Sequence, residues 1–156
     1  MSNQHQKAIF ITGSSSGLGR ATAKLFAAKG WKVIASMRDP NEEKELAKTA
    51  GVTLIALDIT EAQKIERVVQ EVVGSVGVDV VFNNAGYGLA GALEGLTDEQ
   101  IHRMVNTNML GAIRTTKAFI PYFRQKRAGL FINTTIGWRT TDGSSQLDLS
   151  RDEMGA

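Results

Sequence analysis

The sequence predicts an α/β fold, a doubly wound parallel sheet with helices on both faces. Three observations lead to this prediction. Short apolar segments alternate with segments of helical periodicity along most of the 156 residues. The first apolar segment, residues 7–11 (KAIFI), lacks a polar face, as is typical of a central parallel strand. A glycine-rich turn then joins it to a helical segment, as in a unit of two parallel strands and a crossover helix.

The expected elements follow one another in strict alternation. Strands are predicted at residues 7–11, 31–36, 52–57, 78–82 and 130–133. Helices are predicted at residues 17–28, 42–50, 60–73 and 97–127. The charged second helix would begin after Pro40-Asn41 and end at Gly51.

Two helices carry recognisable start signals. Thr60 with Gln63 has the spacing of a capping box. Thr97 is a good N-cap, and the acidic residues Asp98 and Glu99 follow it at the positive end of the helix. We expect a break in this last, long helix near Gly111.

Composition excludes several classes of protein. The chain is 42% hydrophobic and 22% charged, with a formal charge of +2, which favours one globular domain over a disordered or nucleic-acid-binding chain. It has no cysteine, so disulfides, thiolate nucleophiles and cysteine-ligated metals are excluded. The histidines, His5 and His102, are isolated, and we expect no metal site. We expect no membrane span or signal peptide, and a cytoplasmic location.

The glycine-rich turn, residues 12–19 (TGSSSGLG), carries the main functional signal. Gly13 suits a tight turn, Gly17 allows a phosphate close to the backbone, and Gly19 removes a side chain where the helix packs. The N–H groups at the helix start and the serine hydroxyls would bind an anion. A Walker phosphate loop requires Gly-Lys-Ser/Thr, whereas this chain has Leu18-Gly19-Arg20. The turn therefore predicts a nucleotide site of another type.

The spacing T-G-x-x-x-G-x-G resembles that of the classical short-chain dehydrogenase/reductase family. Four further segments match the family in order: Asp58 after the third strand, residues 83–86 (NNAG), residues 108–111 (NMLG) and residues 129–133 (GLFIN). The resemblance covers roughly residues 7–135. It implies a Rossmann-type sheet with strand order 3-2-1-4-5, to which the complete family fold adds further strands and helices.

The resemblance also implies a nicotinamide dinucleotide cofactor and the residues around it. The expected cofactor-binding residues are Gly13, Ser15, Ser16, Gly17, Leu18, Arg38, Asp58, Ile59, Asn84, Ala85 and Gly86. Asn108 matches the asparagine that kinks the family's long helix and holds a catalytic-site water. The family also often forms dimers through this helix, here residues 97–127, so a homo-oligomer is expected there.

Charge distinguishes the two forms of the cofactor. A carboxylate at the end of the second strand would bind the ribose hydroxyls of NAD and repel the 2′-phosphate of NADP. That position is Met37, and Arg38 follows it. A guanidinium there would bind the phosphate, so NADP is favoured over NAD, unless Asp39 turns inward instead.

The resemblance fails at the catalytic groups. The family transfers hydride between nicotinamide and a carbonyl or alcohol, using a serine and a Tyr-x-x-x-Lys pair. Here the serine position holds Ile136, the only tyrosines are Tyr87 and Tyr122, and no lysine follows Lys126. We therefore expect this chain to be inactive.

The codons of residues 136–155 suggest an explanation. Shifted by one base, the Met154-Gly155 junction must encode tryptophan, and Glu153-Met154 encodes lysine or arginine. Leu149-Ser150 can encode tyrosine, and Ile136-Gly137 can encode serine thirteen positions earlier, which is the family's spacing. Our hypothesis is a one-base frameshift near residues 135–136 that truncates the enzyme. The alternative is a natural non-catalytic relative.

The resulting organisation has three parts: a disordered tail (residues 1–6), an NAD(P)-binding domain (7–135) and an irregular, out-of-frame tail (136–156). The expected function is NADP-dependent oxidation or reduction of a small carbonyl/alcohol substrate, with no nucleic-acid or membrane partner. A non-catalytic nucleotide-binding module and a dimerising module are the alternatives.

Sequencing the gene across the codons for residues 133–156 tests the frameshift hypothesis. We expect one inserted or deleted base near residues 135–136 whose correction restores serine, tyrosine and lysine together. If no single-base change restores all three, the chain is a natural non-catalytic relative.

Overall fold

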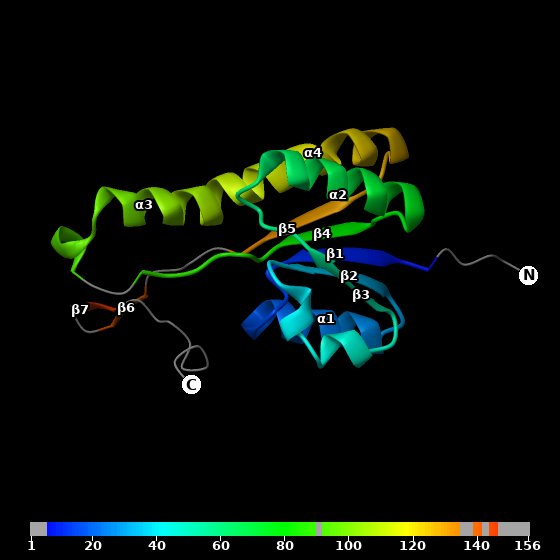
Figure 1. Ribbon diagram of the computed structural model, residues 1–156, viewed down its shortest axis with the longest axis horizontal. Coiled ribbons are helices and arrows are strands. Elements are labelled where there is room, and N and C mark those ends of the chain that lie inside the picture. The colour runs from blue at the N-terminus through cyan, green and yellow to red at the C-terminus, as the bar shows by residue number, and fades with distance from the viewer. Residues whose placement is uncertain (1–5, 90–91, 135–138, 142–143, 147–156) are drawn as a thin grey trace, which may run out of the picture.

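The fold is built on one parallel sheet in the order β3-β2-β1-β4-β5 (Figure 1). The structure is a computed structural model, and it describes residues 6–89, 92–134, 139–141 and 144–146. The strands are β1 (Ala8–Thr12), β2 (Lys32–Met37), β3 (Val52–Ala56), β4 (Val80–Asn83) and β5 (Leu130–Asn133). The predicted fold class and strand order are confirmed.

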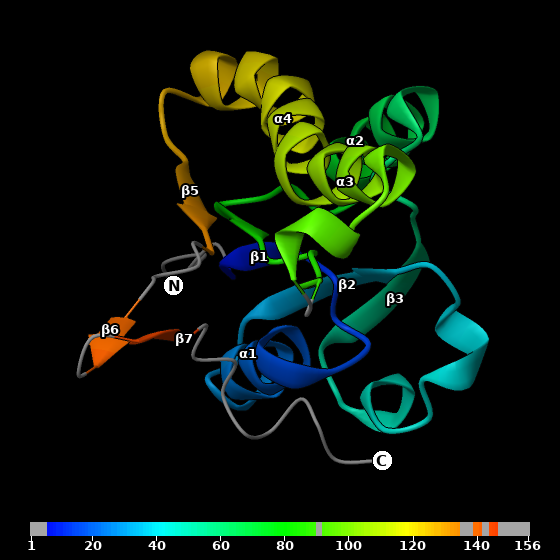
Figure 2. The ribbon, with the colours of Figure 1, turned by 90° about the vertical axis from the view of Figure 1, so that its left-hand side faces the viewer.

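Helices cover both faces of the sheet (Figures 1 and 2). Helix α1 (Gly17–Ala28) lies on one face, and α2 (Ala62–Ser75) and α4 (Ala112–Lys126) lie on the other. Because β1 is central, it is buried on both faces. Phe10 contributes to the core beneath α2 and α4, where its ring centroid lies 5.1 Å from that of Phe119, and Ile9 and Ile11 contribute to the core beneath α1.

The long helix is interrupted where the sequence predicts a break. Helix α3 (Asp98–Val105) passes through a π-helical segment, Asn106–Gly111, into α4. Thr97 caps α3, and Gln100 completes a capping box. A Cβ at Gly111 would lie 2.5 Å from Ile59 Cδ1, so the glycine allows this segment to approach the loop after β3.

The predicted helix at residues 42–50 is wrong. Two short 3₁₀ turns, η1 (Pro40–Glu42) and η2 (Leu46–Lys48), stand in its place. Glu43 between them has an extended backbone, and its buried carboxylate accepts hydrogen bonds from the N–H groups of Glu45 and Leu46, both at 3.0 Å. The carboxylate thus takes the place of helical carbonyls as the hydrogen-bond acceptor.

The predicted capping box at the start of α2 is also wrong. The N-cap is Glu61, which makes no side-chain cap hydrogen bond. Thr60 instead donates from its backbone N–H (2.9 Å) and its hydroxyl (2.7 Å) to Asp58 Oδ1. The Thr60 hydroxyl therefore binds Asp58 in the turn after β3 and does not cap the helix.

The outer strand β5 exposes apolar side chains, as expected for a sheet edge. Leu130 and Ile132 are 53% and 39% exposed, whereas Phe131 on the opposite face packs against Phe123 at 5.0 Å between ring centroids. Exposed apolar edge strands promote aggregation, and we therefore expect this 156-residue chain to be marginally stable.

The predicted irregular tail contains two short strands. β6 (Arg139–Thr141) and β7 (Ser144–Gln146) pair antiparallel, with Asp142-Gly143, a dipeptide favoured in hairpin turns, between them in the sequence. The remaining residues of the tail, including the serine and tyrosine positions of the frameshift hypothesis, lie outside the described residues.

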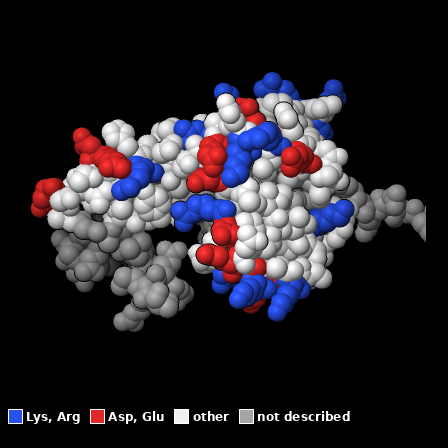
Figure 3. Space-filling model, in the orientation of Figure 1, with Lys and Arg blue, Asp and Glu red and all other residues white. Residues whose placement is uncertain are grey.

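Charge is distributed without a single dominant patch on the face drawn in Figure 3, where acidic and basic side chains are interspersed. Among the described residues, no helix combines the length and the apolarity needed to cross a bilayer. Within the same ranges, no three His, Cys, Asp or Glu side chains gather as metal ligands do.

Candidate functional site

A cleft of about 770 Å³ opens at the carboxyl ends of the strands. This is the edge at which open parallel sheets bind ligands. The turns after β1, β2, β3 and β4 line it, and α3 closes one side. The lining residues are Gly13, Ser15, Ser16, Leu18, Met37, Arg38, Leu57, Asp58, Ile59, Thr60, Asn84, Ala85, Gly86, Tyr87, Leu89, Gln100, Arg103, Asn106 and Thr107.

The glycine-rich turn has the backbone geometry of an anion site. Gly13 (φ 68°) and Gly17 (φ 49°) both adopt positive φ, a backbone conformation that residues other than glycine rarely adopt. Ser16 precedes α1 in an extended conformation and makes no side-chain cap hydrogen bond. The N–H groups of the first helical turn therefore remain available to a negatively charged ligand.

The three serines of the turn have different environments. Ser15 and Ser16 are exposed and line the cleft. Ser14 is fully buried, and its hydroxyl donates to the Ile11 carbonyl at 3.1 Å. Its backbone N–H donates to the Ser36 carbonyl at 3.0 Å. Our expectation that all three hydroxyls face a ligand is thus wrong for Ser14, which joins the turn to β2.

The turns after β1 and β4 are in direct contact. The Thr12 hydroxyl accepts hydrogen bonds from the N–H groups of Asn84 and Ala85, both at 3.0 Å. Asn84 Nδ2 donates back to the carbonyls of Thr12 (3.1 Å) and Gly13 (3.0 Å). A Cβ on Gly13 would lie 2.6 Å from Ala85 Cα. These contacts hold the glycine-rich turn against residues 83–86.

Gly19 has a more specific role than helix packing on a strand. A Cβ at this position would lie 2.3 Å from the Gly13 carbonyl oxygen and 2.5 Å from Asn84 Nδ2. The missing side chain therefore lets α1 pack against the glycine-rich turn itself and leaves room for the Asn84 side chain.

Asp58 and Ile59 lie together in the cleft after β3. Burial tends to raise the pKa of the Asp58 carboxyl, but hydrogen bonds from Thr60 and the charges of Arg38 and Lys64 outweigh it and lower the pKa. The carboxyl is therefore ionised at neutral pH, and it accepts hydrogen bonds without donating any. Ile59 is 6% exposed and forms an apolar wall beside it.

Arg38 is the cation at the end of β2. It is exposed and lines the cleft next to Met37. Asp39, in contrast, caps η1: its Oδ1 accepts hydrogen bonds from the Asn41 backbone N–H (2.9 Å) and side-chain Nδ2 (3.0 Å). Asp39 does not line the cleft, so the charged residue that does so here is the arginine.

Two predicted residues lie beside the cleft rather than on its wall. Gly17 starts α1 between two lining residues. Asn108 lies in the π-helical segment, and its Oδ1 accepts from the Tyr87 N–H (3.0 Å) while its Nδ2 donates to the Tyr87 carbonyl (2.7 Å). Asn108 thereby fixes the backbone after Gly86. The other predicted cofactor-binding residues all line the cleft.

Sequence reasoning missed the contribution of α3. Gln100 and Arg103 of α3 line the cleft, and Asn106 and Thr107 of the π-helical segment line it beside them. The spacing of three residues places Gln100 and Arg103 on one face of a helix, but the sequence does not show that this face turns toward the cleft. Tyr87 and Leu89, which follow the Asn-Asn-Ala-Gly segment, were missed as well.

Comparisons with known proteins agree with this geometry. Residues 7–138 match the family described as short chain dehydrogenase. A 3-ketodihydrosphingosine reductase from Bacteroides thetaiotaomicron is 37% identical over 131 residues, which are 83% of this chain and 47% of that protein. The chain spans about half the length of the curated relatives it matches.

Solved structures are similar to this chain over about half of their own length. A short-chain dehydrogenase from Streptomyces avermitilis superposes with a TM-score of 0.77 at 34% identity, covering 82% of this chain and 48% of that one. An alcohol dehydrogenase from the archaeon Thermococcus sibiricus, complexed with 5-hydroxy-NADP, gives 0.76 at 33% identity, covering 84% and 58%. With its family match over most of its length, its sheet order and its cleft, the chain belongs to the short-chain dehydrogenase/reductase family.

Proposed function

We propose that this chain is the cofactor-binding part of an NADP-dependent oxidoreductase acting on a small carbonyl or alcohol substrate. The observation that carries the proposal is Arg38 at the mouth of a cleft whose floor is a glycine-rich turn at a helix N-terminus. The complex of the Thermococcus sibiricus relative with 5-hydroxy-NADP supports a nicotinamide dinucleotide at this site.

The residues of the cleft fit such a cofactor. The positive φ angles of Gly13 and Gly17 and the open start of α1 suit a pyrophosphate. Asp58 and the apolar Ile59 suit the adenine end, and the backbone held by Asn108 borders the far side of the cleft. The bound cofactor would supply or accept hydride, whereas these residues would bind and orient it.

Selectivity for NADP would come from Arg38. A guanidinium forms charge-assisted, forked hydrogen bonds to a phosphate, worth about 1.5–3 kcal/mol. The alternative in which Asp39 faces the ribose is disfavoured, because the Asp39 carboxylate is engaged by Asn41.

This chain would bind the nucleotide without catalysing hydride transfer to or from it. Of its two tyrosines, Tyr122 accepts a hydrogen bond from the Val78 N–H at 3.1 Å, at the opposite end of β4 from the cleft. Tyr87 lines the cleft, but the residue four positions later is Gly91 instead of lysine. An acid/base tyrosine needs a nearby cation to lower its pKa.

Nucleotide binding tests the proposal directly. We expect the wild-type chain to bind NADPH, measured by the change in nicotinamide fluorescence, with no NADPH oxidation when carbonyl substrates are added. Gly19→Ala should abolish binding, because the new Cβ would overlap the Gly13 carbonyl and Asn84. Gly74→Ala in α2 is the matched control, since in the described part of the chain its Cβ would meet no atom within 4 Å apart from its chain neighbours and the backbone of its own helix. A wild-type chain that binds no NADPH would contradict the proposal, and turnover would contradict the non-catalytic assignment.

Replacement of Arg38 tests the choice of cofactor. Arg38→Leu should weaken NADPH binding by a factor on the order of ten to a hundred and leave NADH binding nearly unchanged, because only NADPH has the 2′-phosphate. Lys44→Leu removes an exposed cation from the same connection, away from the cleft, and should change neither affinity. Equal losses for both nucleotides in Arg38→Leu would show that Arg38 does not recognise the phosphate.

A second candidate function, self-association, rests on one surface of the long helix. Four apolar side chains recur along α3, the π-helical segment and α4: Val105, Met109, Ile113 and Ile120, which are 38%, 57%, 51% and 38% exposed. Apolar side chains in such a row mark a protein–protein contact more often than a solvated face. We propose that a second copy of this chain pairs here.

Sedimentation equilibrium over a range of concentrations tests this pairing. The wild-type mass should rise toward that of a dimer, and Ile113→Glu should remain monomeric because it places a charge within the row. Gln125→Glu introduces the same charge at another exposed position of α4 and should still associate. A wild-type chain that stays monomeric at high concentration would exclude the dimer.

A further inference from the structure

Glu43 is a buried carboxylate in the connection between β2 and β3, where the charged residues on either side of it are exposed. The residue is 4% exposed, whereas its neighbours Glu42 and Lys44 are exposed. Its Oε1 accepts the hydrogen bonds from Glu45 and Leu46 that begin η2. A buried charge is costly unless it is paired, and these two backbone donors engage only one of its oxygens.

The partner of the second oxygen is Arg20, in the first turn of α1. Arg20 Nη2 lies 2.7 Å from Glu43 Oε2. The contact is an ion pair and does not have the angles of a hydrogen bond. In the described part of the chain, Glu43 Oε2 has no hydrogen-bond partner, and the neighbouring Arg20 Nε has none either. Burial tends to raise the pKa of Glu43, but the backbone donors and Arg20 outweigh it and lower the pKa, so the pair is ionised.

Arg20 also reaches the glycine-rich turn. The same Nη2 donates a hydrogen bond to the carbonyl of Ser15. Because the peptide unit is planar and trans, the Ser16 N–H points in the opposite direction from that carbonyl. Holding the Ser15 carbonyl toward Arg20 therefore turns the Ser16 N–H away from Arg20. Ser15 and Ser16 both line the cleft.

We propose that Arg20 and Glu43 are positioning residues for cofactor binding: Glu43 holds the Arg20 guanidinium, and Arg20 orients the Ser15–Ser16 peptide of the glycine-rich turn. The inference rests on the proposed nucleotide site and assigns to it two residues that do not line the cleft. It also links the turn to the connection that follows Arg38, since Glu43 belongs to that connection.

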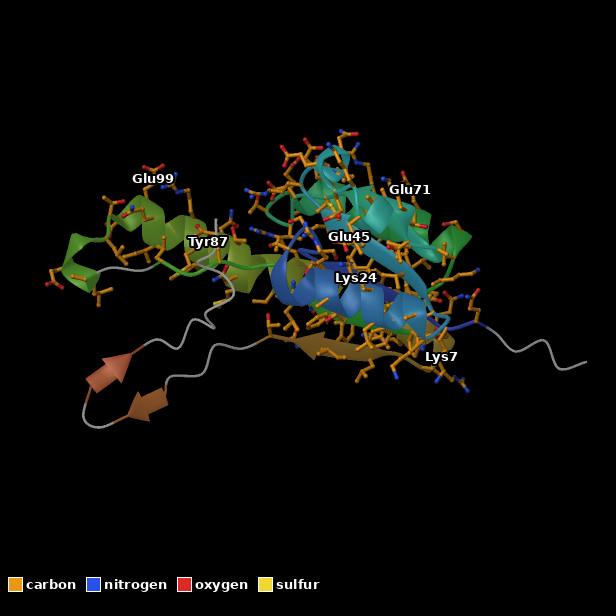
Figure 4. All side chains as sticks on the ribbon, turned by 90° about the horizontal axis from the view of Figure 1, so that it is seen from below. Lys7, Lys24, Glu45, Glu71, Tyr87 and Glu99 are labelled. Atoms are coloured by element: carbon orange, nitrogen blue, oxygen red, sulfur yellow. The ribbon has the colours of Figure 1, made fainter. Side chains whose placement is uncertain are left out.

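A purely structural role is the competing explanation, and the chain contains a control for it. Lys24 and Glu45 form a second ion pair between α1 and the same connection, and Figure 4 shows them side by side. The two side chains are 40% and 58% exposed, and among the described residues the Lys24 ammonium pairs with Glu45 and not with the glycine-rich turn. If α1 and the connection only need to be fastened together, loss of either pair should have the same consequence.

The test compares two neutralised pairs in the full chain. Arg20→Met with Glu43→Gln removes both charges, keeps an acceptor for the Glu45 and Leu46 N–H groups, and leaves no unpaired buried charge. We expect NADPH and NADH to bind about tenfold more weakly, equally for both, because the pyrophosphate is common to them. Lys24→Met with Glu45→Gln should bind both nucleotides within about twofold of wild type.

A conservative variant guards against a folding defect. Arg20→Lys keeps the positive charge near Glu43, but the lysine side chain is one bond shorter and does not bring its nitrogen to the place where Arg20 Nη2 contacts both Glu43 and Ser15. It should weaken binding about threefold or more while the melting temperature stays near that of wild type. Unchanged nucleotide affinity in Arg20→Lys, or equal losses in the two double variants, would overturn the inference while leaving the proposed function intact. A wild-type chain that fails to bind NADPH would overturn both.

Discussion

The contact between the turns after β1 and β4 is the constraint on which the rest of the site depends. One hydroxyl, that of Thr12, accepts two backbone N–H groups from the neighbouring turn, and one amide, that of Asn84, donates to two carbonyls in return. Gly13 has no room for a side chain at this contact. These hydrogen bonds join two adjacent central strands at their carboxyl ends, beneath the cleft. Because Gly19 packs against the Gly13 carbonyl and Asn84, the same contact also determines where α1 begins.

The elements that could be predicted from the sequence are those determined by local pattern. β1 and β4 are apolar runs, and α3 begins at a Thr97 capping box, so their type and approximate bounds follow from neighbouring residues. Residues 42–50 were mispredicted because their conformation depends on Arg20, more than twenty positions earlier, which stabilises the buried Glu43. Helical periodicity contains no information about such a partner.

The residues of the candidate site likewise divide into those that could be predicted from the sequence and those that depend on the arrangement of distant elements. Gly13 could be identified because a tight turn after a strand requires a glycine, whereas Asn84 and Ala85 were identified through the resemblance of residues 83–86 to the family. Arg103 and Gln100 could not, because their place beside the cleft results from the direction in which α3 leaves the sheet. The burial of Ser14 likewise depends on β2, since its N–H binds the Ser36 carbonyl.

Binding and chemistry are physically separable in this architecture. The groups suited to hold a dinucleotide come from turns at the carboxyl ends of β1 to β4 and from α3, all within the part of the chain that matches the family. The family's proton-transferring groups belong to the segment after β5, where this sequence departs from the pattern. The turns after β1 and β4 are fixed to each other by their own hydrogen bonds, between Thr12 and Gly13 on one side and Asn84 and Ala85 on the other. Among the described residues, the lining of the cleft therefore comes from the turns after β1 to β4 and from the helix beside them, and not from the segment after β5. The exposed apolar edge of β5 is the feature of the described structure that favours aggregation.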